Sequence, residues 1–391
     1  MSLRRFLSLL ALVLLLASSP ATAAETAPAD LDVMIGQMIM AGFRGYTVDE
    51  NSPIMRDIRE RHLGGVVLFD RDMTLPEGEG RNIKDPAQVA KLTAMLQKAS
   101  YIPLLIGVDQ EGGKVQRLKK KYGFTETPSA AELGKSSAKA VYEAGQAVGE
   151  TLALAGFNLD FAPLADVNVN PDCPVIGKLD RSFSADPEQV AKCDEMFLEG
   201  LASRDVIGCL KHFPGHGSAG DDSHQGLTDV TSTWSEKELI PYKRLIGKDP
   251  VKMIMTAHIF NANLDSEYPA TLSKAVITDL LRKKLCFDGV VITDDLNMRA
   301  ITEFYGLDEA VRRAIDAGAD ILLFGNNISY DPEIVQNVVE IIRNLVERGT
   351  ITEERIRQSY DRIIRLKRML NIPGGCPLCR SGASQGSGAE S

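Results

Sequence analysis

The 391-residue sequence lacks two features that would point to a large anionic or lipid partner. It has no excess of basic residues, because 53 Asp and Glu outnumber 44 Lys and Arg and the formal net charge is -9. Partners with a phosphate backbone are held by clustered Lys and Arg, so we expect no nucleic acid. It also has no apolar run approaching the roughly 20 residues that span a bilayer. We therefore expect no stable membrane insertion of the mature chain.

The N-terminus carries an apolar run that is too short to span a membrane but is typical of an export signal. Arg4 and Arg5 precede the apolar residues 6–17, and small residues follow at 21–23. This order of basic, apolar and small residues predicts a secretory signal peptide over residues 1–24. The mature protein is then exported, to the periplasm or to the medium.

Six cysteines follow the predicted signal, and an oxidising compartment would permit them to pair. Their spacing does not reveal the pairing. Cys376 and Cys379 have the spacing of a redox or zinc motif, but no second pair completes a set of four ligands. Residues 373–391 are rich in Gly and Ser, so we interpret the pair as a local disulfide in a disordered tail.

The sequence between residues 35 and 370 alternates short apolar runs with longer amphipathic patterns, as in a parallel α/β protein. Eight strand–helix units favour a closed (β/α)₈ barrel, a TIM barrel, as a single catalytic domain over residues 25–372. A doubly wound open sheet is the alternative. The eight predicted strands cover residues 35–43, 65–69, 104–108, 157–162, 206–210, 252–257, 290–293 and 319–324.

Several helix starts are marked by capping residues. Asp before Pro predicts a start at three positions, and Ser235 with Glu238 has capping-box spacing. Residues 331–370 predict two helices outside the barrel, separated at Gly349. The Asp-Pro pairs are Asp85–Pro86, Asp186–Pro187 and Asp331–Pro332.

Polar residues follow the predicted strands at their carboxyl ends. Because barrel active sites form at the carboxyl ends of the strands, these side chains should converge on one pocket, which an open sheet would not require. They are Asp109, Asp166, Lys211, His212, His258 and Asp294.

Three of the five histidines lie within the 13 residues from His212 to His224. A metal site is disfavoured because Pro214 interrupts any helix, so His212, His216 and His224 lack the helical i, i+4 framing of metallohydrolases. A structural role in a tight loop remains open for His216. We favour acid/base catalysis by His224 with Asp222, since a carboxylate beside an imidazole fixes its tautomer and favours its protonated form.

Asp294 ends an apolar strand and is the candidate nucleophile, because an ionised carboxylate can trap an oxocarbenium-like centre. Alternation along a strand turns Asp295 to the other side, where it would orient the loop. We interpret a set of five polar residues as a sugar-binding clamp, since Arg and Asp can bind adjacent hydroxyls bidentately. The alternative is an ion-pair network closing the barrel mouth. The group is Asp109, Arg117, Arg181, Lys211 and His212.

These residues resemble glycoside hydrolase family 3, in its β-N-acetylglucosaminidase branch. The resemblance rests on residues 109–118, 211–217 with 222–224, and 293–298. It implies a (β/α)₈ barrel, retention of configuration, Asp294 as nucleophile, and His224 as acid/base held by Asp222. It also implies sugar contacts by the five residues of the clamp. Because the chain is predicted to be exported, we hypothesise a carbohydrate substrate from cell-wall fragments or chitin-type glycans.

The family's β-glucosidases differ, since they carry Trp after the nucleophile and a second domain, whereas this chain has Asp295 there and its lone Trp at 234. A phosphorylase of the same family would also fit these residues, and so would a non-catalytic saccharide-binding protein of the cell envelope. We expect a monomer that needs no metal and no cofactor.

Overall fold

The computed structural model describes residues 29–75, 80–222 and 226–370. Eight parallel strands in this part form one sheet in the order β11-β9-β7-β6-β3-β2-β1-β12. A parallel bridge between Ile292 and Ile321 joins the two outer strands, so the sheet closes on itself. The predicted (β/α)₈ barrel is confirmed. The strands are β1 Ile39–Gly42, β2 Gly65–Val67, β3 Leu105–Val108, β6 Leu159–Asp160, β7 Ile207–Phe213, β9 Met253–Thr256, β11 Val290–Ile292 and β12 Leu322–Phe324.

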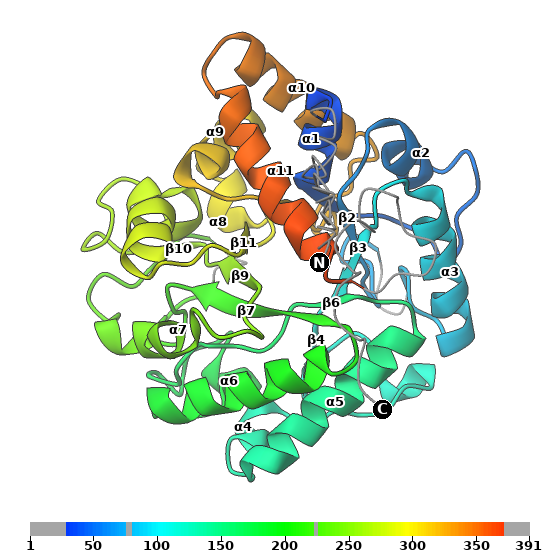
Figure 1. Ribbon diagram of the computed structural model, residues 1–391. Coiled ribbons are helices and arrows are strands. Elements are labelled where there is room, and N and C mark those ends of the chain that lie inside the picture. The colour runs from blue at the N-terminus through cyan, green and yellow to red at the C-terminus, as the bar shows by residue number, and fades with distance from the viewer. Residues whose placement is uncertain (1–28, 76–79, 223–225, 371–391) are drawn as a thin grey trace, which may run out of the picture.

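Helices surround the strands, which occupy the centre of the view in Figure 1. The α-helices are α1 Leu31–Gln37, α2 Pro53–Glu60, α3 Pro86–Ala99, α4 Ala130–Leu133, α5 Ala138–Leu154, α6 Pro187–Ala202, α7 Ile240–Leu245, α8 Arg299–Thr302, α9 Leu307–Ala317, α10 Ile334–Glu347 and α11 Glu353–Lys367. A π-helix, η5, covers Ala275–Lys284, and short 3₁₀ turns are η1 Lys120–Tyr122, η2 Gly177–Leu179, η3 Glu236–Leu239 and η4 Ala270–Leu272.

The barrel interior is filled by side chains rather than open. Met40 and Phe161 are almost completely buried. A Cβ added to Gly107 of β3 would lie 2.8 Å from the Met40 methyl and 3.1 Å from the Phe161 ring. Only a glycine therefore leaves these two side chains room at this position. A packed interior of this kind confines binding to the mouth of a barrel.

The first predicted strand, residues 35–43, was wrong in its first part. Residues up to Gln37 belong to α1, whose N-cap Asp30 accepts a hydrogen bond from the Asp32 amide, and the strand begins only at Ile39. Met34 and Ile35 of this helix are fully buried. An apolar run that is buried on all sides does not distinguish helix from strand, and so the boundary was misplaced.

Two of the predicted Asp caps are confirmed, at Asp85 for α3 and Asp186 for α6. The third is wrong, because α10 begins at Ile334 and Asp331 instead accepts the Glu333 amide in a local turn. The two predicted outer helices are present as α10 and α11, and Gly349 between them has a φ of 68°.

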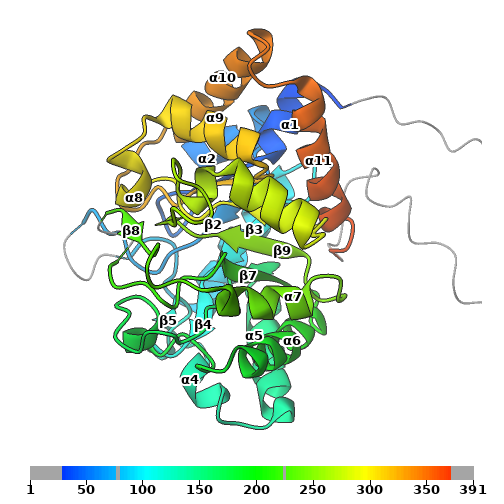
Figure 2. The same cartoon turned by 90° about the vertical axis from the view of Figure 1, so that its left-hand side faces the viewer.

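Additional short elements lie at the carboxyl end of the barrel. β8 (Thr228–Asp229) and α8 follow strands β7 and β11, and Figure 2 shows them on the side of the molecule away from α11. β8 pairs with β10 (Ile259–Phe260) at this carboxyl end.

No helix in the described ranges is long and apolar enough to cross a membrane.

The cysteines of the described part are unpaired. Cys173, Cys193 and Cys209 are buried with free thiols, and Cys286 is exposed and free. Cys376 and Cys379, together with the predicted tail, lie outside the described residues, as does the predicted signal peptide.

Candidate active site

Five charged side chains form a continuous chain of ion pairs at the carboxyl ends of β3 and β7. Arg117 Nη2 lies 3.1 Å from Asp109 Oδ2, and Lys211 Nζ lies 3.0 Å from Asp109 Oδ1. Lys211 also contacts Glu111 Oε1 at 2.8 Å, and Glu111 binds Arg181 bidentately with both distances 2.7 Å. Four of the five predicted clamp residues are thus brought together, and the ion-pair network that was the alternative interpretation is present.

A short hairpin places the two acids of this chain. Strand β4 (Gln110–Gly112) pairs antiparallel with β5 (Val115–Gln116), immediately after Asp109. Gly112 has a φ of 97°, and a Cβ there would lie 2.1 Å from the Pro128 carbonyl oxygen. The tight turn returns the chain so that the Arg117 amide donates to the Asp109 carbonyl at 3.1 Å.

The charges of this network are mutually stabilised. Burial would raise the pKa of Asp109, but the cations of Lys211 and Arg117 outweigh it and hold that pKa below its usual value. Burial likewise opposes ionisation of Glu111, whose pKa is lowered by Arg181 and Lys211. Three cations share two carboxylates, and so the network keeps one positive charge in excess. A surface of this kind can donate hydrogen bonds to several hydroxyls at fixed positions.

Lys211 and His212 lie within β7 rather than after it, which corrects the predicted end of this strand. The pairing of β7 with β9 is irregular between Leu210 and Phe213. Such an irregularity changes the alternation of side chains, which explains how two consecutive residues both reach polar partners at the barrel mouth. A run of apolar residues in the sequence does not reveal such an irregularity in strand pairing.

His212 is held by Asp166. Its Nδ1 lies 2.6 Å from Asp166 Oδ2, and Asp166 Oδ1 accepts the backbone amides of His212 and His216 at 3.3 and 2.7 Å. Burial opposes the charge on Asp166, but the neighbouring His212 keeps its pKa low. With Nδ1 so occupied, Nε2 is the ring nitrogen of His212 left for a ligand.

His216 is buried and lies edge-on to the His212 ring, with 5.9 Å between the ring centroids. Burial and the nearby His212 lower its pKa to about 4, so it is neutral near pH 7. This environment agrees with the structural interpretation of His216. Among the described residues, no group of three or more His, Cys, Asp or Glu is placed to hold a metal ion.

The loop that follows β7 is anchored from two sides. Glu238 Oε2 accepts the Gly217 amide at 2.9 Å, and Trp234 Nε1 donates to the Pro214 carbonyl at 3.1 Å. A Cβ on Gly217 would lie 1.7 Å from the Val167 carbonyl oxygen. The capping box predicted for Ser235 and Glu238 is wrong, because Ser235 caps η3 without a side-chain hydrogen bond and Glu238 is used by this loop.

Asp294 follows β11 at the carboxyl end of the barrel and is half-buried. Its Oδ1 accepts the Asp295 amide at 2.8 Å. Asp295 orients the loop, as predicted, because its Oδ1 accepts the amides of Gly325 and Asn297 at 2.8 and 2.9 Å. His258 Nε2 donates to the Asp295 carbonyl at 2.9 Å.

The predicted acid/base pair falls at the edge of what the structure describes. Asp222 is half-buried at the end of the anchored loop. His224 lies outside the described residues. In the sequence, both stand between the end of β7 at Phe213 and the start of β8 at Thr228.

Comparison with known proteins identifies the family. A sequence profile of the glycosyl hydrolase family 3 N terminal domain matches residues 30–366. The chain belongs to glycoside hydrolase family 3. It is 32% identical to β-hexosaminidase LpqI of Mycobacterium tuberculosis, over 85% of this chain and 81% of that protein. It is also 32% identical to β-hexosaminidase A of Pseudoalteromonas piscicida, over 90% of this chain.

A family 3 β-N-acetylglucosaminidase from Paenibacillus sp. str. FPU-7 has a similar structure, with a TM-score of 0.79 and 37% identity over 90% of this chain. This chain spans 66% of the Paenibacillus chain and 63% of the Pseudoalteromonas protein. Some of its relatives are therefore longer than this family 3 member.

The predicted clamp of this family 3 site did not include Glu111, and Asp160 was not among the predicted site residues. Asp160 of β6 is fully buried, and its Oδ1 accepts the amide of Gln110, next to Asp109, at 3.0 Å. Burial raises the pKa of Asp160 to about 8, so its carboxyl is largely protonated at neutral pH. The sequence feature that could have identified Asp160 is a single Asp within the predicted strand 157–162. Such a residue needs a partner wherever the strand is buried.

Proposed function

We propose that this protein is a retaining, exo-acting β-N-acetylhexosaminidase that hydrolyses terminal β-linked N-acetylglucosamine through a covalent glycosyl-aspartate intermediate. The observation that carries the proposal is the ion-pair chain from Arg117 to Arg181 at the same barrel end as Asp294, in a chain of this family. The printed names of the relatives, β-hexosaminidase and β-N-acetylglucosaminidase, agree with the choice of sugar.

In the proposed mechanism the clamp residues hold the sugar. Asp109, Arg117, Arg181 and Lys211 would contact its hydroxyls, together with Nε2 of His212. Buried charges that are already paired lose little solvation when a neutral sugar arrives. Their fixed geometry therefore selects the arrangement of the hydroxyls with a small entropic cost.

The chemical step uses two groups. Asp294 attacks the anomeric carbon and forms a bond to it, while protonated His224 gives its proton to the departing oxygen. Neutral His224 then removes a proton from water, which attacks the same carbon and releases Asp294. Asp222 would support both protonation states of His224. A histidine assisted by a carboxylate suits an acid/base role near neutral pH.

The role of Asp294 can be tested with Asp294→Ala and an aryl β-N-acetylglucosaminide. We expect kcat to fall by at least roughly a thousandfold. Added azide should partly restore turnover and give the α-glycosyl azide, because azide replaces the missing nucleophile on the opposite face of the sugar. The matched control is Asp288→Asn, which changes an exposed carboxylate at the other end of β11 and should leave kcat unchanged. Near-normal turnover by Asp294→Ala would refute the proposal.

The role of His224 can be tested by varying the leaving group. His224→Ala should slow substrates with poor leaving groups far more than activated aryl substrates, since only the former need a proton. Equal losses would remove the acid role. Rates measured with and without phosphate distinguish hydrolysis from phosphorolysis.

The proposal also assigns a compartment and a substrate source. The chain would be exported through its residues 1–24 and act as a monomeric catalytic domain of residues 25–372. Its substrates would be cell-wall fragments or chitin-type oligosaccharides. A product profile on muropeptides compared with chitobiose would show which of the two it prefers.

A further inference from the structure

A cavity lies at the opposite end of the barrel from the candidate active site. It has a volume of about 390 Å³ and lies among η5, the end of α9 and the first turns of α11. Gly289 and Asp320 beside it immediately precede β11 and the last barrel strand. Asp294 lies five positions after Gly289, which corresponds to about 16 Å along an extended strand. The cavity is thus separate from the sugar site.

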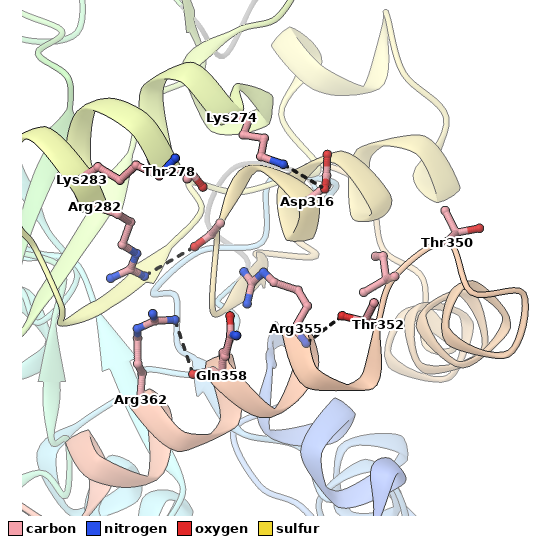
Figure 3. A pocket seen from close by; sticks show the side chains of 12 residues that line it. Lys274, Thr278, Arg282, Lys283, Asp316, Thr350, Thr352, Arg355, Gln358 and Arg362 are labelled. Carbon is pink, nitrogen blue, oxygen red and sulfur yellow. Dashed lines mark hydrogen bonds and ion pairs between the residues drawn. The ribbon is translucent and has the colours of Figure 1, made fainter.

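The lining of this cavity is strongly basic, although the chain as a whole is acidic. Its charged residues are Lys274, Arg282, Lys283, Arg355 and Arg362, with Asp316 as the one acid in the lining. Figure 3 shows the side chains of Arg282, from η5, and of Arg355 and Arg362, from α11, on facing walls.

Most of these cations have acidic partners. Asp320 is fully buried and binds both Arg282 and, at 3.2 Å, Arg362. Lys274 Nζ lies 4.0 Å from Asp316. Lys283 Nζ lies 2.8 Å from an oxygen of Asp279. Arg362 also lies 3.4 Å from Asp288, so four carboxylates balance these four cations.

Arg355 differs from the other four, since no carboxylate of the described residues makes an ion pair with it. Its guanidinium donates instead to neutral oxygens, the carbonyls of Ile315 and Ala319 at 3.0 and 2.6 Å and the Ser359 hydroxyl at 2.7 Å. Burial lowers the pKa of Arg355, and the cations of Arg362 and Arg282 lower it further, against the opposing effect of Asp320. Arginine nevertheless stays charged in proteins.

Arg355 is partly buried and no carboxylate of the described residues contacts it directly, so an anion that reaches it would gain a favourable charged partner. Three of the five N–H groups of Arg355 are used by the neutral oxygens, which leaves two for a ligand. Guanidinium groups bind phosphate and sulfate oxygens in a planar, two-point geometry. Thr350 and Gln358 add neutral hydrogen-bonding groups to the same wall.

We propose that this cavity binds a tetrahedral oxyanion, the phosphate or sulfate group of a small ligand, with Arg355 at its floor and Lys274 and Lys283 at its rim. The lysine side chains are 63% and 70% exposed, so they can turn toward an anion without disturbing the fold. The anion can arrive as free phosphate or as a phosphate ester, because both present the same oxygens.

The test is a calorimetric titration of the full chain with inorganic phosphate and, separately, with glycerol 3-phosphate. Both are measured at constant ionic strength and compared with a titration with chloride. We expect saturable binding of one equivalent. The double variant Lys274→Gln/Lys283→Gln should weaken it by about three- to tenfold, because two rim charges are lost. The matched control Lys139→Gln/Lys243→Gln removes two surface lysines elsewhere and should bind as the parent chain does.

Tighter binding of the ester than of free phosphate would identify a phosphorylated ligand, and equal binding a free anion; both support the site. The proposal is overturned if phosphate behaves like chloride, or if the rim variant binds as tightly as its control. Arg355→Gln gives a second measurement where it folds, and its loss of binding should exceed that of the rim variant. Hydrolysis of an aryl substrate by the rim variant should match the parent chain, so this test stands apart from the proposed function.

Discussion

The substitution Glu111→Gln tests whether the ion-pair chain at the barrel mouth is maintained by its buried charges. Glu111 is 4% exposed at its side chain and accepts hydrogen bonds from Arg181 and Lys211. The amide of Gln has nearly the same volume but no charge, and its NH₂ group would face one of the two cations. Lys211 keeps Asp109 as a partner, whereas Arg181 would lose its only carboxylate among the described residues.

The magnitude follows from this asymmetry. Removing one partner of a buried ion pair costs about 3–5 kcal/mol, because the other charge remains in the interior. We expect the lower end, about 3 kcal/mol, since the remaining amide oxygen still accepts one hydrogen bond. A domain of this size unfolds with a urea dependence of roughly 3 kcal/mol per molar, and so the midpoint should fall by about 1 M.

The matched control is Glu188→Gln. Glu188 also binds an arginine bidentately, Arg244, but the two side chains are 52% and 62% exposed. An exposed pair of this kind contributes little to stability, even with the favourable position of Glu188 in the first turn of α6. Equal shifts of the urea midpoint for the two variants would refute the argument that burial decides the strength of the network. Glu111→Gln should also raise KM, because Arg181 loses its carboxylate partner and Lys211 loses one of its two.

Three further predictions concern buried polar groups away from the reacting atoms. Asp160→Asn should keep the hydrogen bond to Gln110 and most of the stability at pH 7, whereas Asp160→Ala should lose about 1–3 kcal/mol in urea unfolding. Burial raises the pKa of Glu238 from 4.5 to about 7, so the folded state holds this proton more tightly than the unfolded chain does. The free energy of unfolding should therefore fall by roughly 3 kcal/mol as the pH rises from 4.5 to about 7. Glu238→Gln should make the urea midpoint less dependent on pH over this range. Lys367→Met should lower the melting temperature far more than Arg368→Met, because Lys367 donates from a buried position to two oxygens at 2.7 Å while Arg368 is exposed.

The barrel was predictable because its signal is repeated along the whole chain. Each of the eight strands overlaps an apolar run of the sequence, and burial on both faces makes such runs continuous. The gathering of polar residues at one end of the barrel follows from the same topology, since the carboxyl ends of all eight parallel strands lie there. The boundary between α1 and β1 was misplaced because both elements are buried and apolar there, and the end of β7 was placed too early because Lys211 and His212 are polar.

The contacts that join distant segments were not predictable from local pattern. Glu238 has the spacing of a helix cap, yet its carboxylate binds the Gly217 amide, 21 residues away. Asp331 stands before proline but belongs to a turn. For Glu238 the local capping rule competed with a tertiary contact, whereas for Asp331 it competed with a local turn. The residues next to either acid do not distinguish the two outcomes. The basic cavity is a further example, because it joins η5 with α11, which are far apart in the sequence.

The structure gives a physical reason why Asp295, rather than a tryptophan, can follow the candidate nucleophile. Its carboxylate accepts the Gly325 amide beyond β12, and its carbonyl accepts a hydrogen bond from His258 beyond β9. The segment that carries Asp294 is therefore tied to the strands on both sides of β11. A carboxylate that must approach a carbon atom along one direction benefits from such support, because little conformational freedom remains to be lost when the substrate binds. Glycine at 325 is required for this arrangement, since a Cβ there would lie 2.4 Å from an oxygen of Asp295.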